Sequence, residues 1–272
     1  MRNFSTSPQY AFKSIISNKN LIMSLTKREI LGRYKGSIGG ILWSLINPIL
    51  MLGVYTFVFG FIFKARFASL NQPDVNFPIA LFIGLIIFGV FSDCLSRAPT
   101  LITAHANYVK KVVFPLELLP VITLCSSLFH AMISFFVWLV FYFIVIGVPH
   151  YTVFIFPFML LPIIAFSLGS MWLFSALGVY LRDISQIIGF AVTALMFLSA
   201  IFYPISSLPD EYQIFMLFNP FAVIIDQSRS LLMFEQMPDP QIFSIISGVS
   251  FLYMCFGFFF FQKCRKGFAD VI

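Results

Sequence analysis

The feature of this sequence that most limits its fold is a run of 64 residues, Leu118 to Leu181, without a single Asp, Glu, Lys or Arg. A charge at the centre of a bilayer costs about 2.5–3.5 kcal/mol, so long charge-free runs are the segments that can lie in lipid. A helix crosses a bilayer in about 20 residues, which makes this run too long for one crossing. Gly147, Pro149 and His150 mark a turn inside it, and we expect one membrane span on each side of that turn.

The composition extends this interpretation to the whole chain. Of its residues, 60% are hydrophobic and only 10% are charged, whereas soluble proteins carry about 25% charged residues. A membrane β-barrel would show segments of about ten residues that alternate between apolar and polar side chains, but the apolar runs here are continuous. The sequence therefore predicts an all-α integral membrane protein.

Charge-free runs divide the chain into six expected transmembrane helices. The expected spans lie at about residues 39–63, 77–96, 116–146, 151–180, 185–205 and 240–262, within a transmembrane domain over 39–262. Between spans five and six, the uncharged run from Tyr212 to Ile225 is too short to cross and is interrupted by Asn219-Pro220. This pattern predicts a re-entrant external hairpin over 210–235.

The ends of the chain are expected to be cytoplasmic. Seven Lys or Arg residues precede the first span, three follow the second, one follows the fourth and three follow the sixth, and positive residues in short loops are retained inside. We therefore expect cytoplasmic N-terminal and interface helices over 1–38, a cytoplasmic tail over 263–272, no cleaved signal peptide, and residence in a bacterial inner membrane. The net charge of +6 then belongs to the cytoplasmic leaflet and not to a nucleic-acid site. As an alternative, the basic N-terminal segment only fixes the topology.

No pattern in the sequence indicates a metal site or a disulfide framework. Cys94, Cys125, Cys255 and Cys264 form no CxxC pair, and we interpret them as packing residues. His130 lies inside the third span, where a hydrogen bond to a neighbouring helix is favoured over a proton relay. We predict no metal and no cofactor in this chain.

The source of energy is inferred from two absent patterns. All eleven carboxylates lie outside the charge-free runs, which leaves ion-coupled transport little chemistry to use. The chain also has no GxxxxGK[ST] motif to cradle nucleotide phosphates. We expect a transport permease that is not an enzyme and depends on a partner for energy. The loop from Asp93 to Glu117 is long enough for a short interfacial helix that such a partner could grip, or it simply connects two spans.

Six short motifs, spread over nearly the whole chain, are individually weak but specific in their order and spacing. They are Leu25-Thr26-Lys27-Arg28-Glu29-Ile30, Arg33-Tyr34-Lys35-Gly36-Ser37, Gly39-Gly40-Ile41-Leu42-Trp43-Ser44-Leu45-Ile46-Asn47-Pro48, Phe114-Pro115-Leu116-Glu117-Leu118-Leu119-Pro120, Tyr180-Leu181-Arg182-Asp183-Ile184 and Phe218-Asn219-Pro220. In this order they resemble the permease subunits of bacterial ABC transporters that export O-antigen, capsular polysaccharide or teichoic acid.

The resemblance implies a homodimer bound to two copies of a separate ATPase subunit, which would hold the ATP and Mg. It implies export of a lipid-linked polysaccharide, foremost lipopolysaccharide O-antigen, through a channel between the two copies. The residues expected to couple to the ATPase are Ala104, His105, Asn107, Tyr108, Lys110, Lys111, Arg182 and Asp183. Those expected to steer the anionic head group are Arg28, Arg33 and Lys35.

Aromatic residues are the candidates for lining the channel, because a sugar has apolar C–H faces and a polar rim that Tyr and Trp match. The candidates are Trp43, Tyr55, Phe59, Phe63, Phe202 and Tyr203. The alternative interpretation is that Phe faces lipid and that Trp and Tyr anchor the ends of spans. Two other functions stay open: a drug exporter, disfavoured because the connection between spans one and two is short, and a membrane scaffold or enzyme subunit, which shows no clustered polar residues.

Overall fold

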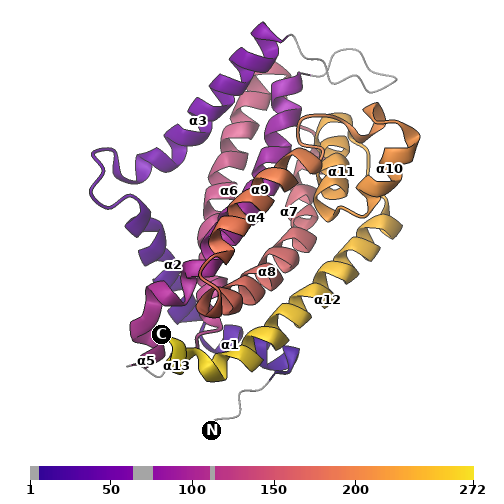
Figure 1. Ribbon diagram of the computed structural model, residues 1–272. Helices are drawn as coiled ribbons and strands as arrows, with labels where there is room; N and C mark the ends of the chain where they lie inside the picture. The colour runs from indigo at the N-terminus through magenta and orange to yellow at the C-terminus, as the bar shows by residue number, and fades with distance from the viewer. Residues whose placement is uncertain (1–5, 64–75, 111–113) are drawn as a thin grey trace.

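The computed structural model of the chain describes residues 6–63, 76–110 and 114–272. These residues form helices and turns and no strand, which confirms the all-α class. The helices are α1 (Pro8–Ser17), α2 (Lys19–Arg33), η1 (Gly40–Leu42), α3 (Trp43–Tyr55), η2 (Thr56–Ile62), α4 (Phe77–Leu101), η3 (Thr103–His105), α5 (Ala106–Lys110), α6 (Leu118–Val145), η4 (Tyr151–Ile155), α7 (Phe156–Met159), α8 (Leu161–Tyr180), α9 (Ile184–Leu198), η5 (Ile205–Ser207), α10 (Asp210–Leu217), α11 (Pro220–Phe234), α12 (Pro240–Cys264), η6 (Arg265–Gly267) and α13 (Phe268–Val271). The short helices α1, α5 and α13 lie at one end of the bundle and the pair α10–α11 at the other (Figure 1).

Five helices in the described residues are long and apolar enough to cross a membrane. They are Gly40–Ile62, Phe77–Leu101, Leu118–Val145, Tyr151–Tyr180 and Pro240–Val271. The expected fifth span corresponds to α9, which has only 15 residues, and its helix ends well before residue 205. The helix stops because Ala200 adopts a left-handed conformation with φ of 53°. Six crossings therefore stay a prediction, with α9 as the shortest candidate.

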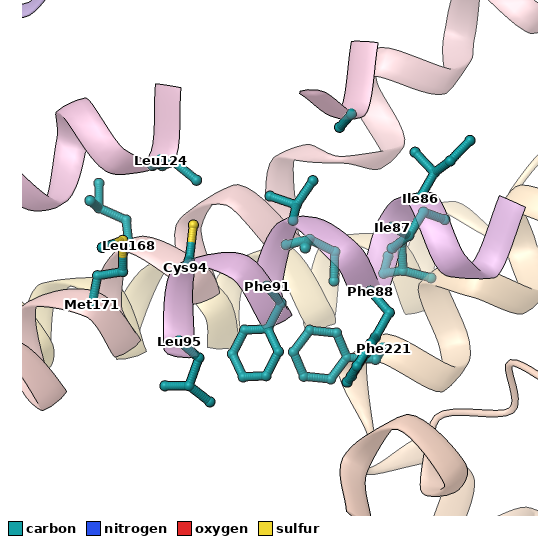
Figure 2. Close-up of a cluster of buried hydrophobic side chains, with 14 of the residues drawn as sticks. Ile86, Ile87, Phe88, Phe91, Cys94, Leu95, Leu124, Leu168, Met171 and Phe221 are labelled. Atoms are coloured by element: carbon teal, nitrogen blue, oxygen red, sulfur yellow. The ribbon is translucent and has the colours of Figure 1, made fainter. Parts of the chain in front are cut away.

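The core is built around α4. In its most apolar window, 72% of α4 is buried, against 6% for the first candidate span, which packs against α6 and α4. Figure 2 shows α4 contributing side chains on several sides, including Phe91, whose ring centroid is 4.4 Å from that of Phe221 in α11. The central helix thus joins the hairpin of α10 and α11 to the bundle, while the first span lies at its periphery.

Glycines allow α8 to pack closely against two other helices. A methyl group on Gly178 would lie 2.1 Å from the carbonyl oxygen of Pro99 in α4. A methyl group on Gly257 of α12 would lie 2.2 Å from the carbonyl oxygen of Gly169 in α8. Small residues at such crossings let backbones approach and gain van der Waals contact, which drives helix association in lipid.

The two ends of the chain meet at the entrance of α6. Glu117 is 1% exposed, and its carboxylate accepts hydrogen bonds from Ser14 of α1 at 3.0 Å and from Arg265 at 2.6 Å. Arg265 also donates to the carbonyl oxygen of Phe114 at 3.2 Å. We call Ser14, Glu117 and Arg265 the terminal clasp. Burial, and secondarily the Glu117 carboxylate, raises the pKa of Tyr10, which lies beside the clasp.

The segment between α9 and α12 is a helical hairpin, α10 followed by α11. The Asn219 side chain begins α11 by accepting from the backbone nitrogen of Phe221 at 3.0 Å. Arg229 is 2% exposed and donates to the carbonyl oxygen of Ala80 at 2.9 Å, to that of Ala200 at 2.6 Å and to that of Ile201. These bonds satisfy carbonyl groups freed where α9 ends and attach the hairpin to α4.

Candidate functional site

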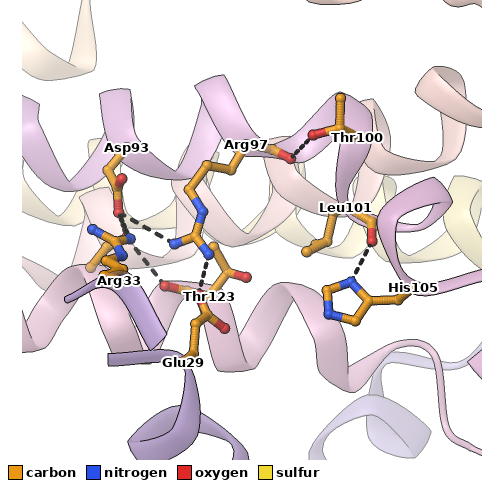
Figure 3. A network of polar contacts seen from close by, with 9 residues as sticks. Glu29, Arg33, Asp93, Arg97, Thr100, Leu101, His105 and Thr123 are labelled. Atoms are coloured by element: carbon orange, nitrogen blue, oxygen red, sulfur yellow. Dashed lines mark hydrogen bonds and ion pairs between the residues drawn. The ribbon is translucent and has the colours of Figure 1, made fainter. Parts of the chain in front are cut away.

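An ion network joins α2, the expected interface helix, to the central helix α4 (Figure 3). Arg33 of α2 contacts Asp93 of α4 at 2.5 Å, and Arg97 of α4 donates to Glu29 of α2. Arg97 also lies 3.8 Å from Asp93, and Ser127 of α6 donates to the same carboxylate. Two cations and two carboxylates balance one another, so the network is close to neutral.

Asp93 lies inside the expected second span, about residues 77–96, and the structure places it within α4, which continues to Leu101. A carboxylate near a helix end is tolerated there because Arg33 and Ser127 satisfy it, and those partners come from other helices. This position agrees with the expectation that carboxylates lie outside the charge-free runs, since the second run ends at Ser92.

The segment expected to couple to the ATPase forms η3 and α5, and aromatic stacking holds it in place. The Tyr108 ring stacks on Phe114 with centroids 4.6 Å apart and on His105 with centroids 5.7 Å apart. Arg28 of α2 donates to the Tyr108 hydroxyl at 2.8 Å. The candidate coupling residue Tyr108 is therefore held against both α2 and the entrance of α6.

The remaining coupling candidates that the structure describes are all exposed. Ala104, Asn107 and Lys110 are exposed, whereas Lys111 lies outside the described residues. Arg182 and Asp183 are exposed in the turn between α8 and α9. They lie at the same end of the bundle as η3, because Gly178, one turn earlier, contacts Pro99 near the end of α4.

The structure places the three head-group candidates in different surroundings. Arg33 is paired with Asp93, and Arg28 with the Tyr108 hydroxyl. Lys35 is exposed beyond the end of α2. Sequence reasoning missed the partners of both arginines, since Asp93 and Tyr108 are 60 and 80 residues away along the chain.

Four of the six aromatic candidates come together near the C-terminal end of the first span. Phe59 is the centre of this aromatic cluster: its ring centroid is 6.3 Å from Tyr55, 5.8 Å from Phe63, 5.3 Å from Phe77 and 6.3 Å from Phe202. Phe77 was not among the candidates, although it is the first residue of α4 and fully apolar. The cluster joins the first span to the segment after α9.

The other two aromatic candidates lie apart from Phe59. Trp43 begins α3, and its indole packs over Gly39. Tyr203 donates to the carbonyl oxygen of Phe197 at 3.0 Å, which closes the end of α9. In residues 6–63, 76–110 and 114–272, no three His, Cys, Asp or Glu side chains gather as a metal site would need.

Comparison with known families identifies the architecture. Residues 20–233 match the ABC-2 type transporter family. The chain belongs to the ABC-2 type transporter family. This confirms the resemblance drawn from the six motifs, and residues 20–233 of this ABC-2 chain include α2, the ion network, η3, α5 and the hairpin.

Individual relatives match this ABC-2 transporter over nearly its full length. The O-antigen export system permease protein RfbA of Myxococcus xanthus is 26% identical over 262 residues, which cover 96% of this chain and 98% of the relative. The protein of that name from Klebsiella pneumoniae is 24% identical over 254 residues, 93% of this chain and 95% of the relative. The polysialic acid transport protein KpsM of Escherichia coli is 25% identical over 220 residues, 79% of this chain and 82% of the relative.

Proposed function

We propose that this chain is the permease subunit of an ABC exporter that moves a lipid-linked polysaccharide, foremost lipopolysaccharide O-antigen, across the bacterial inner membrane. The observation that carries the proposal is the end-to-end match to two O-antigen export permeases, which includes both the interface helices and the external hairpin. A chain that shared only the membrane scaffold would match over the spans alone.

The energy would come from a separate ATPase subunit that binds the ATP and Mg. Support comes from the exposed side chains of η3 and α5, which stand on a rigid base formed by Tyr108 and Phe114. Arg182 and Asp183 present a second exposed patch at the same end of the bundle. A rigid, exposed segment between two spans can pass the movement of a bound ATPase to α4 and α6.

Two copies of the chain would enclose the export channel. Support comes from the first candidate span, which is 6% buried and exposes large apolar side chains such as Leu50, Val54 and Phe57. Lipid covers part of this surface, and a second copy would cover the rest around the aromatic cluster. Placing α1 and α13 at one end of the bundle fits cytoplasmic termini and a re-entrant hairpin α10–α11 on the external side (Figure 1).

Anionic head groups of the substrate would first meet the basic side chains of the interface segment. Lys35 is exposed, and the exposed Arg28 guanidinium lies beside the coupling segment. Phosphate oxygens accept charge-assisted hydrogen bonds from such groups. Membrane lipids with anionic heads would compete for the same surface.

Deleting the gene for this chain tests the proposal. We expect loss of the surface polysaccharide and accumulation of the lipid-linked glycan on the cytoplasmic side, with both reversed by the wild-type gene. Normal surface glycan in the deletion strain would contradict the proposal. The glycan that accumulates also separates O-antigen from capsular polysaccharide, the second candidate, which the match to KpsM favours.

A further inference from the structure

A polar cavity of about 350 Å³ lies between the first span, α4 and α6. Asn47 and Tyr55 of α3 line it, together with His130 and Ser134 of α6. In the 28-residue helix α6, His130 and Ser134 lie about 18 and 24 Å from the start, near the middle of the helix. The cavity therefore reaches the depth of the hydrocarbon core.

Several polar groups around this cavity make no hydrogen bond within the protein. Among the described residues, His130 Nε2 is buried without a partner, and no hydrogen bond is formed by the exposed Asn47 amide or by the half-buried hydroxyls of Ser134 and Tyr55. His130 Nδ1 is different, because it lies 3.4 Å from the Tyr34 hydroxyl. Unpaired polar groups at membrane depth cost several kcal/mol each unless a ligand or water satisfies them.

The opposite wall of the cavity is apolar. Phe82, Leu85 and Ile86 of α4 form it, and the ring of Tyr55 adds an aromatic face. A cavity with hydrogen-bonding groups on one side and an apolar wall on the other matches a pyranose ring, which has hydroxyl groups at its rim and C–H groups on its faces. Its volume falls in the range of about 300–1,000 Å³ that small-molecule sites occupy.

Charge argues against a phosphate as the occupant. Arg33 is the one Lys or Arg that lines the cavity, and the Asp93 carboxylate contacts it at 2.5 Å. Its guanidinium is therefore already neutralised, and a phosphate would be repelled by Asp93. An uncharged ligand with several hydroxyl groups suits the cavity better.

We propose that this cavity binds a single sugar ring of the exported glycan, with Asn47, Ser134 and the Tyr55 hydroxyl as hydrogen-bonding partners. The proposal rests on the proposed function, since it assigns a contact for that substrate within one copy of the chain. The cavity would be a sugar-binding site of the permease that is separate from the exposed basic residues of the interface segment.

The test uses the complex of this chain with its ATPase in nanodiscs and measures binding of free glucose, galactose, mannose, rhamnose and N-acetylglucosamine by saturation-transfer NMR. We expect the wild type to bind at least one of these sugars. The double variant Asn47→Leu/Ser134→Ala should bind it about tenfold more weakly, because each lost hydrogen bond weakens binding severalfold. Asn47→Gln, which keeps the amide, should retain most of the affinity.

A matched control removes an unpartnered hydroxyl elsewhere in the spans. Ser247 of α12 is buried without a partner and does not line the cavity, so Ser247→Ala should bind sugar as the wild type does. Unchanged binding in the double variant, or no binding by the wild type, would show that the cavity holds water only. Glycan export measured in parallel separates this outcome from failure of the proposed function, because the wild type can export without using the cavity.

Discussion

At the scale of single residues, the contacts whose loss should destabilise the protein most are those between buried charges. Glu117 and Arg265 are 148 residues apart in the chain, yet their side chains meet with 2% and 9% exposure. A buried ion pair adds little compared with an apolar pair of the same shape, but removing one partner leaves an uncompensated charge. The terminal clasp is thus sensitive to loss of either half.

Arg265→Met should therefore destabilise the protein by about 3 kcal/mol or more, because the Glu117 carboxylate would stay buried without its cation. Thermal unfolding in detergent, followed by intrinsic fluorescence, measures the change. The double variant Glu117→Gln/Arg265→Met should recover more than half of the loss. Equal destabilisation in the single and double variants would contradict this interpretation of the clasp.

Phe59 is the residue on which the aromatic cluster depends. Phe59→Ala should slow glycan export severalfold without changing assembly with the ATPase, because its ring contacts both the first span and Phe202. Surface glycan appearing after induction of the gene measures the rate. Phe256→Ala is the control: Phe256 lies in α12 outside the aromatic cluster, is 53% exposed and should leave export unchanged. Normal export by Phe59→Ala would show that the aromatic cluster does not take part in export.

At the scale of elements, the central packing of α4, α8 and α12 differs from the loose attachment of the first span. Backbone contacts at Gly178 and Gly257 leave no space for a side chain at either crossing. The first span packs on α6 and α4 and exposes most of its surface. Movement during transport is therefore expected at the first span and not within the core.

Gly178→Val should prevent stable packing of α8 on α4, since its Cβ alone would overlap the carbonyl oxygen of Pro99. We expect low yield and aggregation in size-exclusion chromatography. Gly248→Ala in α12 is the matched control, because nothing lies within 4 Å of its added methyl group. That control should be stabilised by up to about 1 kcal/mol through helix propensity. A well-behaved Gly178→Val protein would show that this crossing is not tight.

The coupling segment offers a test at the same scale. Tyr108→Ala removes the ring that stacks on Phe114 and should reduce both co-purification of the ATPase and coupled ATP hydrolysis. Tyr108→Phe keeps the ring, loses only the bond from Arg28, and should retain most of both. Tyr212→Ala, in the external hairpin, serves as the control. Undiminished ATPase binding by Tyr108→Ala would place the contact elsewhere.

At the scale of the whole molecule, the topology predicted from positive charges can be measured directly. In a chain with its four cysteines replaced by serine, Lys266→Cys should react only with a reagent that crosses the membrane, and Asp210→Cys with one that does not. Both positions are exposed, so the protein itself does not shield either cysteine from the reagent. Labelling of the two from the same side would contradict a membrane crossing by α12, which lies between them.

Much of the architecture can be predicted from local sequence, because each charged residue placed in lipid carries its own free-energy penalty. Charge-free runs located the five long helices, and Asn219-Pro220 located the break in the hairpin. The charge-free runs alone do not account for Asp93 within α4, because the residues that pair with its carboxylate lie on other helices. The end of α9 could not be predicted from local sequence either, since a left-handed Ala200 is unfavourable locally and is accompanied by the bonds from Arg229.

The candidate sites divide in the same way. Tyr55, Phe59 and Phe63 recur every four residues, so their grouping on one stripe of the first span could be predicted. The pairing of Arg33 with Asp93, which turns a predicted head-group residue into part of the ion network, could not. The polar cavity combines residues of α2, α3, α4 and α6 and had no signal in the sequence beyond the isolated His130.

The terminal clasp also has a consequence for how the protein is made. Residue 265 is synthesised after residue 117, so Glu117 enters the nascent bundle before its cation exists. Until then the start of α6 and the helix α1 lack this anchor. A ribosome that stops short of Arg265 would release a chain with an unneutralised carboxylate at its helix entrance, which a membrane protease could recognise as unfinished.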